Sequence, residues 1–140
     1  MLIISDVNGI PIACSEPIAG NHNDAYELVE NFENMAQSLK KSNIYIDGLF
    51  LNADAGFDTK AFRESLCKYD ITDNIDKNKR NGYDDDLLFD NILYLRRFVI
   101  VRTNAWLDAF KAILVRFETK KSHWKYLNII VFYVVLLRQL

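Results

Sequence analysis

An aspartate at the end of an apolar run is the first feature of this chain that could do chemistry. Residues 49–51 are apolar, residues 52–56 contain Asp54 and a glycine, and a helical pattern begins at about Thr59. A carboxylate at the end of a short strand, on a turn that contains glycine, can be presented into a cleft as an acid. The alternative is a turn-forming aspartate that bonds its own backbone, and this stretch by itself favours that alternative.

The composition is that of one packed domain. The chain has 140 residues, of which half are hydrophobic and 13% are aromatic, and this argues against disorder. Its two cysteines, Cys14 and Cys67, are too few and too far apart for a zinc knuckle. With no secretory leader they predict a reducing, cytoplasmic setting. Cys67 shares a helical apolar pattern with Phe62 and Leu66, so we expect a buried thiol.

Charge is unevenly distributed along the chain. The net charge is −2, but residues 91–140 contain nine Lys or Arg against Asp108 and Glu118. That part is therefore +7, and residues 1–90 carry the remaining −9. The basic part could meet a polyanion, or it could meet the acidic part of the same chain.

Apolar periodicity places the elements around Asp54. Residues 1–6 and 10–14 predict a strand pair joined by an Asn-Gly turn. A helix follows from residue 23 or 24 to Lys41, with Glu27 in a capping box. Its predicted buried stripe has helical spacing and consists of Leu28, Phe32, Met35 and Leu39. Further strands are predicted at residues 44–51 and 71–75, on either side of a helix over residues 59–68.

The last part of the chain predicts a long helix and a closing apolar segment. The helix covers residues 98–117, and its predicted buried stripe consists of Trp106, Phe110, Ile113 and Phe117. A turn at residues 120–124 leads to residues 126–137, which are strongly apolar but shorter than the ~20 residues of a membrane span. The whole pattern indicates a mixed α/β or α+β domain with flanking helices.

Polar clusters between these elements have ordinary structural explanations. The acidic triplet at residues 84–86 looks like a metal site, but adjacent side chains on one element point in different directions. We interpret it as a solvated loop and helix N-terminus. His22 lies in the loop before the first helix, where a lone histidine is usually solvated or hydrogen-bonded.

Four motifs together resemble the catalytic domain of DDE-type transposases of bacterial insertion sequences. They are GNHND at residues 20–24, NADAGFD at 52–58, NKRN at 78–81 and RTNAWLDAFKAILVRFE at 102–118. The family motifs read approximately G-N-x-H-D, A-D-x-G-Y/F-D, N-K-R-N and E-R-T-x-A-W-L, in the same order. The resemblance covers nearly the whole chain, and it is the order of the four motifs that makes it specific.

The resemblance implies a ribonuclease H-like mixed sheet and metal-dependent DNA cleavage and strand transfer. In such chemistry two Mg²⁺ or Mn²⁺ ions, held by carboxylates from separate elements, clamp the attacking and leaving oxygens. The resemblance assigns Asp54 the role of second acidic ligand. His22 and Asp24 match the family's loop motif, and Arg102 and Trp106 match its last helix.

Two departures from the family pattern predict an inactive fragment. The first catalytic Asp of the family lies before the start of this chain, and Asp6, at the entry of a hairpin, suits a turn role instead. The position of the catalytic Glu is Val101, which cannot bind a metal. At about 100° per residue Val101 lies ~140° from Trp106, on a polar face with Asn104 and Asp108. Asp108 is ~10 Å farther along the axis, too far to replace the missing acid.

These observations lead to two expectations about function. The first is a truncated, catalytically inactive transposase domain over residues 1–140 that contacts DNA, such as transposon ends, in a bacterial cytoplasm at the nucleoid. Its expected DNA contacts are mostly basic side chains: His22, Lys77, Lys79, Arg80, Arg102, Lys120 and Lys121. The second is a small interaction module without catalysis, which binds DNA, a full-length transposase or another copy of itself. Neither involves a membrane.

Overall fold

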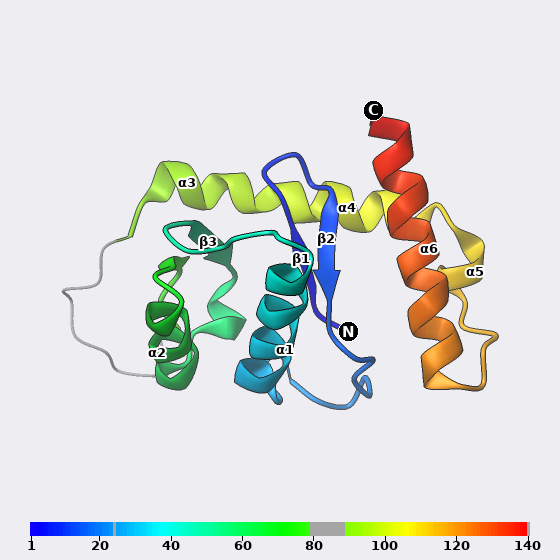
Figure 1. Cartoon of the computed structure of the whole chain (residues 1–140), viewed down its shortest axis with the longest axis horizontal. Helices are drawn as coiled ribbons and strands as arrows, with labels where there is room; N and C mark the ends of the chain where they lie inside the picture. Colours follow the sequence, from blue (N-terminus) through cyan, green and yellow to red (C-terminus); the bar gives the residue numbers. More distant parts are fainter. Residues whose placement is uncertain (24, 79–88, 140) are drawn as a thin grey trace. The chain divides into compact units, whose positions relative to one another are not determined.

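The computed structural model describes residues 1–23, 25–78 and 89–139, which form two compact units. Unit 1 consists of Met1–Ile18 with Phe98–Leu140, and unit 2 consists of Ala19–Arg97. Each unit combines helices with one two-stranded sheet, so the chain is a mixed α/β protein as the sequence predicts (Figure 1).

Unit 1 begins with the predicted hairpin. Strands β1 (Ile3–Ser5) and β2 (Pro11–Cys14) pair antiparallel. The turn between them is held by Asp6, whose Oδ1 accepts hydrogen bonds from the backbone N–H of Asn8 at 2.9 Å and of Ile10 at 2.8 Å. Asp6 is therefore a turn residue, as expected from its place before Asn-Gly.

The hairpin turn is fastened to the first helix of unit 1, α4 (Val99–Asp108). The fully buried hydroxyl of Thr103 donates to the Gly9 carbonyl at 2.6 Å. Gly9 has φ +83°, and a Cβ there would lie 3.1 Å from both Thr103 Oγ1 and a Val99 methyl group. Only glycine meets both conditions, because other residues avoid positive φ and carry a Cβ.

The predicted long helix over residues 98–117 is wrong beyond Asp108. The chain forms α4, then a break at Phe110 (φ −94°, ψ 96°), and then the short helix α5 (Lys111–Leu114). No proline or glycine lies in this stretch, so residue type gives no signal of the break. One consequence is that Phe117, predicted to be buried, is 80% exposed.

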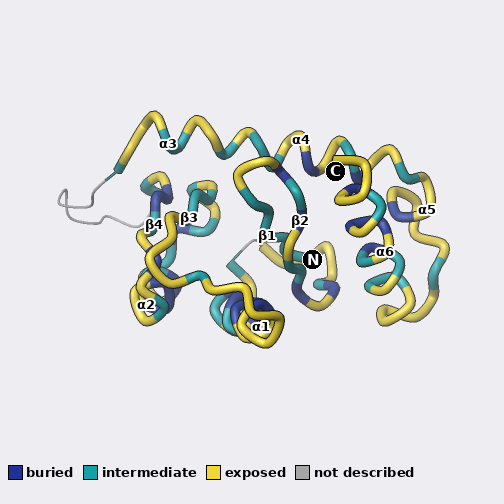
Figure 2. The backbone as a smooth tube through the Cα atoms, turned by 45° about the horizontal axis from the view of Figure 1, so that its top comes forward, coloured by how far each residue is buried: buried dark blue, intermediate teal, exposed yellow. Residues whose placement is uncertain are grey.

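The last helix, α6 (Lys121–Gln139), closes the core of unit 1. The turn predicted at residues 120–124 is therefore wrong after Lys120, since α6 already begins at Lys121. The core cluster consists of Leu107, Ile113, Val131, Phe132 and Val135, with Trp106 and Phe110 packed against it (Figure 2). Only one face of the apolar segment is therefore buried.

Unit 2 begins with a loop and helix α1 (Leu28–Lys41). The predicted stripe of Leu28, Phe32, Met35 and Leu39 is buried, which confirms the periodicity argument. The predicted capping box is wrong, because Glu27 itself precedes the first helical residue with φ 48° and no side chain caps the end. Asp24, the other candidate cap, lies outside the described residues.

A parallel strand pair forms the centre of unit 2. Strands β3 (Phe50–Ala53) and β4 (Thr72–Ile75) are joined by α2 (Lys60–Lys68), whose first turn is capped by the Thr59 hydroxyl. The predicted strand at residues 44–51 is correct only at its end, because residues 44–46 form no strand.

Two shorter elements and one wrong prediction complete unit 2. Helix α3 (Asn91–Leu95) follows β4, and single 3₁₀ turns lie at Ala55–Phe57 and Arg96–Phe98. Cys67, expected to be buried, is exposed. It follows the fully buried Leu66 by one residue, and a helix turns about 100° between neighbours.

The acidic triplet at residues 84–86 and most of the 78–81 motif lie outside the described residues. No helix in the described part of the chain has the length and apolar character needed to cross a membrane.

Candidate functional site

The two parallel strands of unit 2 end side by side, and an aspartate directly follows each of them. Ala53 of β3 is paired with Ile75 of β4, so Asp54 and Asp76 follow them at the same edge of the pair. Carboxyl ends of parallel strands are where ligands bind in open α/β sheets. This edge is therefore the candidate site, and the structure places the predicted residue Asp54 in it.

Asp54 has one local and two distant contacts. Its Oδ1 accepts from the Ala55 N–H at 2.9 Å, which caps the following 3₁₀ turn. The Tyr94 hydroxyl donates to the same oxygen at 3.3 Å, and Arg97 Nη1 lies 3.4 Å from it. The side chain remains 62% exposed. The turn role considered from the sequence is therefore confirmed, and Asp54 also has two polar partners from a distant part of the chain.

Tyr94 lies in α3, and Arg97 lies in the 3₁₀ turn that follows it. The Arg97 guanidinium lies over the Tyr94 ring, 4.6 Å from its centroid, an arrangement that favours a cation–π attraction. Burial raises the pKa of Tyr94, the Arg97 cation lowers it, and the nearby carboxylates of Asp54 and Asp76 raise it. The phenol is thus kept in its protonated form, in which it can donate to Asp54.

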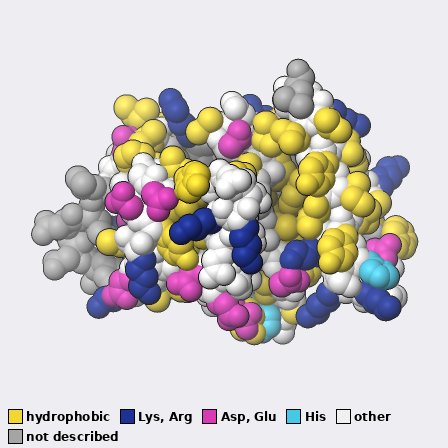
Figure 3. Space-filling view, viewed as in Figure 1, with side chains coloured by type: hydrophobic (Ala, Val, Ile, Leu, Met, Phe, Trp, Pro, Cys, Tyr) yellow, Lys and Arg dark blue, Asp and Glu magenta, His cyan; other side chains and the backbone are white. Residues whose placement is uncertain are grey.

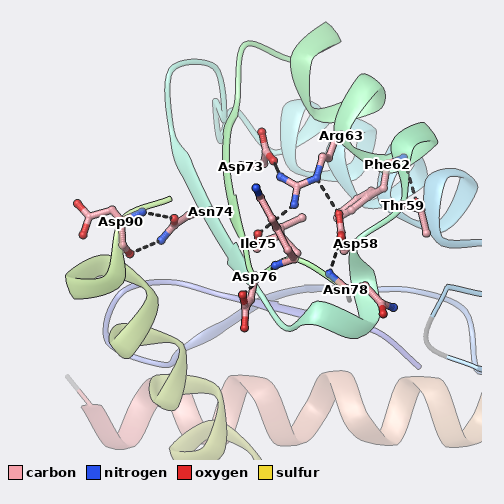
Figure 4. Close-up of polar contacts among 11 residues, drawn as sticks. Asp58, Thr59, Phe62, Arg63, Asp73, Asn74, Ile75, Asp76, Asn78 and Asp90 are labelled. Carbon is pink, nitrogen blue, oxygen red and sulfur yellow. Dashed lines mark hydrogen bonds and ion pairs between the residues drawn. The ribbon is translucent and has the colours of Figure 1, made fainter. Parts of the chain in front are cut away.

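A buried ionic network lies below this edge. The Asp58 side chain is 0% exposed and accepts from Arg63 Nε at 2.8 Å and from the Asn78 N–H at 2.7 Å (Figure 4). Arg63 also pairs with Asp73 and donates to the Ile75 carbonyl at 3.0 Å. The arginine therefore ties α2 to β4, and the carboxylate ties the turn after β3 to the chain after β4.

Asn74 links the strands to α3. Its side-chain amide donates to Asn52 Oδ1 at 2.8 Å and to the Asp90 carbonyl at 3.0 Å, and its oxygen accepts from the Asp90 N–H at 2.9 Å (Figure 4). Asp90 in turn caps α3 by accepting from the N–H groups of Ile92 and Leu93. This chain of contacts fixes where α3 begins, and hence where Tyr94 and Arg97 reach Asp54.

The residues present do not fit the Mg²⁺ or Mn²⁺ site that the family resemblance implies. A divalent ion needs several oxygen ligands with accumulated negative charge. Asp54 instead has a guanidinium at 3.4 Å, and a second cation on the same oxygen would be repelled by it. Among residues 1–23, 25–78 and 89–139, no three His, Cys, Asp or Glu side chains lie close enough together to hold a metal ion.

The residues matched to the family's last helix lie in unit 1. Val101 is 58% exposed on α4, which agrees with its predicted place on the polar face. Arg102, expected to contact DNA, donates to the Asn8 carbonyl and lies over the Trp106 ring at 5.2 Å. Arg102 and Thr103 thus both bind the hairpin turn, which gives this pair a structural role.

The other expected DNA contacts are distributed over both units. In unit 2, His22 is exposed and stacks on Tyr26 with ring centroids 3.7 Å apart, and Lys77 follows Asp76 at the candidate edge. In unit 1, Lys120 and Lys121 are exposed neighbours at the start of α6. The remaining two, Lys79 and Arg80, lie outside the described residues.

Sequence reasoning missed three residues of the site: Asp76, Tyr94 and Arg97. Asp76 could have been found by the rule that identified Asp54, because it directly follows a predicted strand. Tyr94 and Arg97 carry no such signal, since their approach depends on where Asn74 and Asp90 begin α3.

No protein-family model, curated protein or solved structure matches this chain.

Proposed function

We propose that the chain is a catalytically inactive relative of the catalytic domain of DDE transposases, with a ribonuclease H-like fold, that contacts DNA without cleaving it. One observation carries the proposal. Asp54, the second acid in the resemblance, lies at the carboxyl edge of a parallel strand pair, and the Arg97 guanidinium lies 3.4 Å from its carboxylate. The strand position favours the family, and the arginine favours loss of metal chemistry.

Contacts between the matched motifs support the same proposal. Asp58, the last residue of the 52–58 motif, binds the backbone of Asn78, the first residue of the 78–81 motif. Arg102 and Thr103, which begin the last motif, bind the turn between β1 and β2. In unit 2, Asp58 and Asn78 thus join two matched motifs, which is a physical reason for these two motifs to occur together. In unit 1, the last motif is bound to a hairpin turn that lies outside the four motifs.

The DNA contact is proposed for the basic face of unit 1. This unit has seven Lys or Arg against four Asp or Glu, and Lys120 and Lys121 stand at the start of α6. Cations are unfavourable at the positive end of a helix dipole, and a bound phosphate would offset that cost. Lys77, Lys79 and Arg80 of unit 2 are proposed as separate phosphate contacts. The setting in which these contacts matter would be the nucleoid of a bacterial cytoplasm.

The test is binding of the purified chain to a fluorescent duplex, followed by anisotropy at several salt concentrations. We expect binding that weakens steeply with salt, because each phosphate contact releases counterions. Lys120→Glu with Lys121→Glu should weaken binding by tenfold or more and reduce the slope of log K against log salt. The matched control reverses Lys40 and Lys41, an exposed adjacent pair at the end of α1, and should change binding far less. Salt-independent binding, or equal loss in both variants, would contradict the proposal.

A second candidate function is the interaction module without catalysis. The observation that favours it is the set of large apolar side chains that remain exposed on α6. Its occupant would be a protein surface, either a full-length transposase or another copy of this chain. It differs from the first candidate in that binding would not depend on DNA.

A further inference from the structure

Helix α6 presents a regular row of apolar side chains away from its own core. Tyr126, Ile130, Tyr133 and Leu137 are 58–68% exposed and follow one another at intervals of four, three and four residues. We call this row the α6 seam. Apolar side chains gather along α6 on the face shown in Figure 3. Between Trp124 and Leu137, every exposed residue of the helix is apolar or aromatic.

The seam has the shape of a contact with one other helix. At about 100° per residue its four members lie within an arc of about 60°, and the opposite side of α6 is buried in unit 1. Intervals of four and three residues are those of the core positions of a coiled coil, where side chains interlock with a facing helix. One further apolar residue of this stretch, Leu136, is exposed at the edge of the row, but at 36% it is much less exposed than the four members. The spacing of the four most exposed side chains therefore favours a helical partner.

We propose that this partner is α6 of a second copy of the chain, packed antiparallel across a two-fold axis. The axis would pass midway between Ile130 and Tyr133. Tyr126 would then face Leu137 of the partner subunit, and Ile130 would face Tyr133 of the partner subunit. Both pairs place one aromatic ring against one aliphatic side chain, and the same two pairs recur on the other side of the axis. A row that matches its own reverse in this way is what an isologous two-fold interface requires.

The charges at the two ends of α6 are compatible with this arrangement. Lys125 and Arg138 of the partner subunit would come near each other, and each has a contact within its own unit. Lys125 pairs with Glu16, and the Arg138 guanidinium lies 5.2 Å from the centroid of the Phe110 ring. Antiparallel helices also bring opposite ends of their dipoles together, which is favourable.

The exposed area sets the expected strength of the dimer. With large side chains about 60% exposed, the seam offers roughly 500 Å² per copy, or about 1,000 Å² in total. That is the lower limit for a specific interface, so the dimer should be weak and in exchange with the monomer.

Sedimentation velocity of the purified chain without DNA tests the proposal. From low to high micromolar concentration, the weight-average mass should rise from monomer toward dimer. Ile130→Lys and, separately, Tyr133→Lys should raise the dissociation constant tenfold or more, because each buries a charge in both halves of the seam. The control is Phe117→Lys, which changes a more exposed apolar residue of unit 1 outside the seam and should leave association unchanged. Circular dichroism establishes that each variant is folded.

Disulfide trapping tests the orientation. In a background with Cys14→Ser and Cys67→Ser, Tyr126→Cys and Leu137→Cys are prepared as separate proteins and oxidised singly and mixed. The antiparallel dimer predicts efficient cross-linking only in the mixture, whereas a parallel dimer would cross-link each variant with itself. Efficient cross-linking of the single variants would overturn the proposed orientation.

Other occupants of the seam give different results. A chain that stays monomeric at every concentration overturns the proposal, and the seam would then bind a surface other than a second copy of the chain. If that monomer binds vesicles of phosphatidylcholine and phosphatidylserine and Ile130→Lys abolishes binding, the occupant is a lipid surface instead. The DNA-binding proposal is independent of all these outcomes, since the assays contain no DNA and the variants leave Lys120 and Lys121 in place.

Discussion

Asp54 and Asp58 stand four residues apart in one motif and have opposite environments. Asp54 is 62% exposed, with one arginine at 3.4 Å and one tyrosine hydroxyl at 3.3 Å. Asp58 is 0% exposed, with Arg63 at 2.8 Å and the Asn78 N–H at 2.7 Å. The residue that the family resemblance assigns to catalysis is thus the exposed group, and the aspartate four residues later is the buried one that joins two segments of unit 2.

An aspartate in a motif can be required by folding alone. A buried carboxylate must be paired and hydrogen-bonded, because an isolated buried charge is very costly. Asp58 meets this requirement with partners from α2 and from the chain after β4. An exposed carboxylate such as Asp54 has no such requirement, so its position must be explained by function or by its local turn.

The largest expected effect is on stability at these two positions. Asp58→Ala should lower the free energy of unfolding of unit 2 by about 3–5 kcal/mol, because it removes the fully buried partner of Arg63, whose side chain is only 14% exposed. Asp54→Ala should cost less than about 1 kcal/mol, since exposed ion pairs contribute little. Urea unfolding followed by far-ultraviolet circular dichroism measures both.

Tryptophan fluorescence provides the internal control for that experiment. Trp106 and Trp124 both lie in unit 1, so their signal reports a unit that contains neither aspartate. Equal loss of stability in the two variants would remove the distinction between a structural and a surface aspartate.

The next largest effect on stability is expected in unit 1, where α4 carries a buried and an exposed residue two positions apart. Thr103→Val should cost about 1–3 kcal/mol, because the Gly9 carbonyl loses its buried donor. Val101→Glu, two residues earlier and exposed, should change stability by less than about 0.5 kcal/mol. Urea unfolding followed by tryptophan fluorescence reports this unit directly. A large cost for Val101→Glu would show that the family's acid position has become part of a packed surface.

The two cysteines extend the comparison to a partly buried and an exposed thiol, which a reactive probe can distinguish. Burial raises the pKa of the Cys14 thiol, so at mildly alkaline pH less of it is in the reactive thiolate form. Cys67 is exposed on α2. Iodoacetamide followed by mass spectrometry should therefore modify Cys67 at least about tenfold faster than Cys14 in the folded chain. Denaturant should abolish the difference, and a faster Cys14 would contradict the described burial.

The smallest effect tests the contact between Asp54, Tyr94 and Arg97. The Asp54 carboxylate contributes to the raised pKa of Tyr94 and the Arg97 cation opposes it. Asp54→Asn should therefore lower the pKa of Tyr94, and Arg97→Gln should raise it. A titration followed by NMR with ring-labelled tyrosine resolves this residue from the other six. If neither variant changes the pKa measured from the Tyr94 ring resonances, the three groups are not in contact in solution.

Local patterns in the sequence predicted the parts of the fold that depend on neighbouring residues. The Asn-Gly hairpin, the buried stripe of α1 and the strand at β4 follow from turn chemistry and apolar spacing, and the structure confirms them. The helix predicted over residues 98–117 failed because its break at Phe110 has no breaker residue, and tertiary packing of Ile113 decides it instead. The prediction that Cys67 is buried failed because the buried face of α2 ends at Leu66, one residue earlier.

The candidate site was predictable only where the chemistry is local. Asp54 was identified because a strand end and a turn are visible in consecutive residues. Its partner Arg97 is 43 residues away and arrives through the contacts of Asn74 with Asp90. No spacing rule connects residues that are joined only by such a chain of long-range hydrogen bonds.

Asp54 lies beside Arg97, and we propose that it therefore does not support DNA cleavage. The most direct test is nicking of supercoiled plasmid by the purified chain in Mg²⁺ or Mn²⁺, compared with Asp54→Ala prepared in the same way. We expect the two proteins to give the same background level of nicked plasmid, because one arginine-paired carboxylate cannot hold the ions. Metal-dependent nicking by the original chain that Asp54→Ala abolishes would contradict the account.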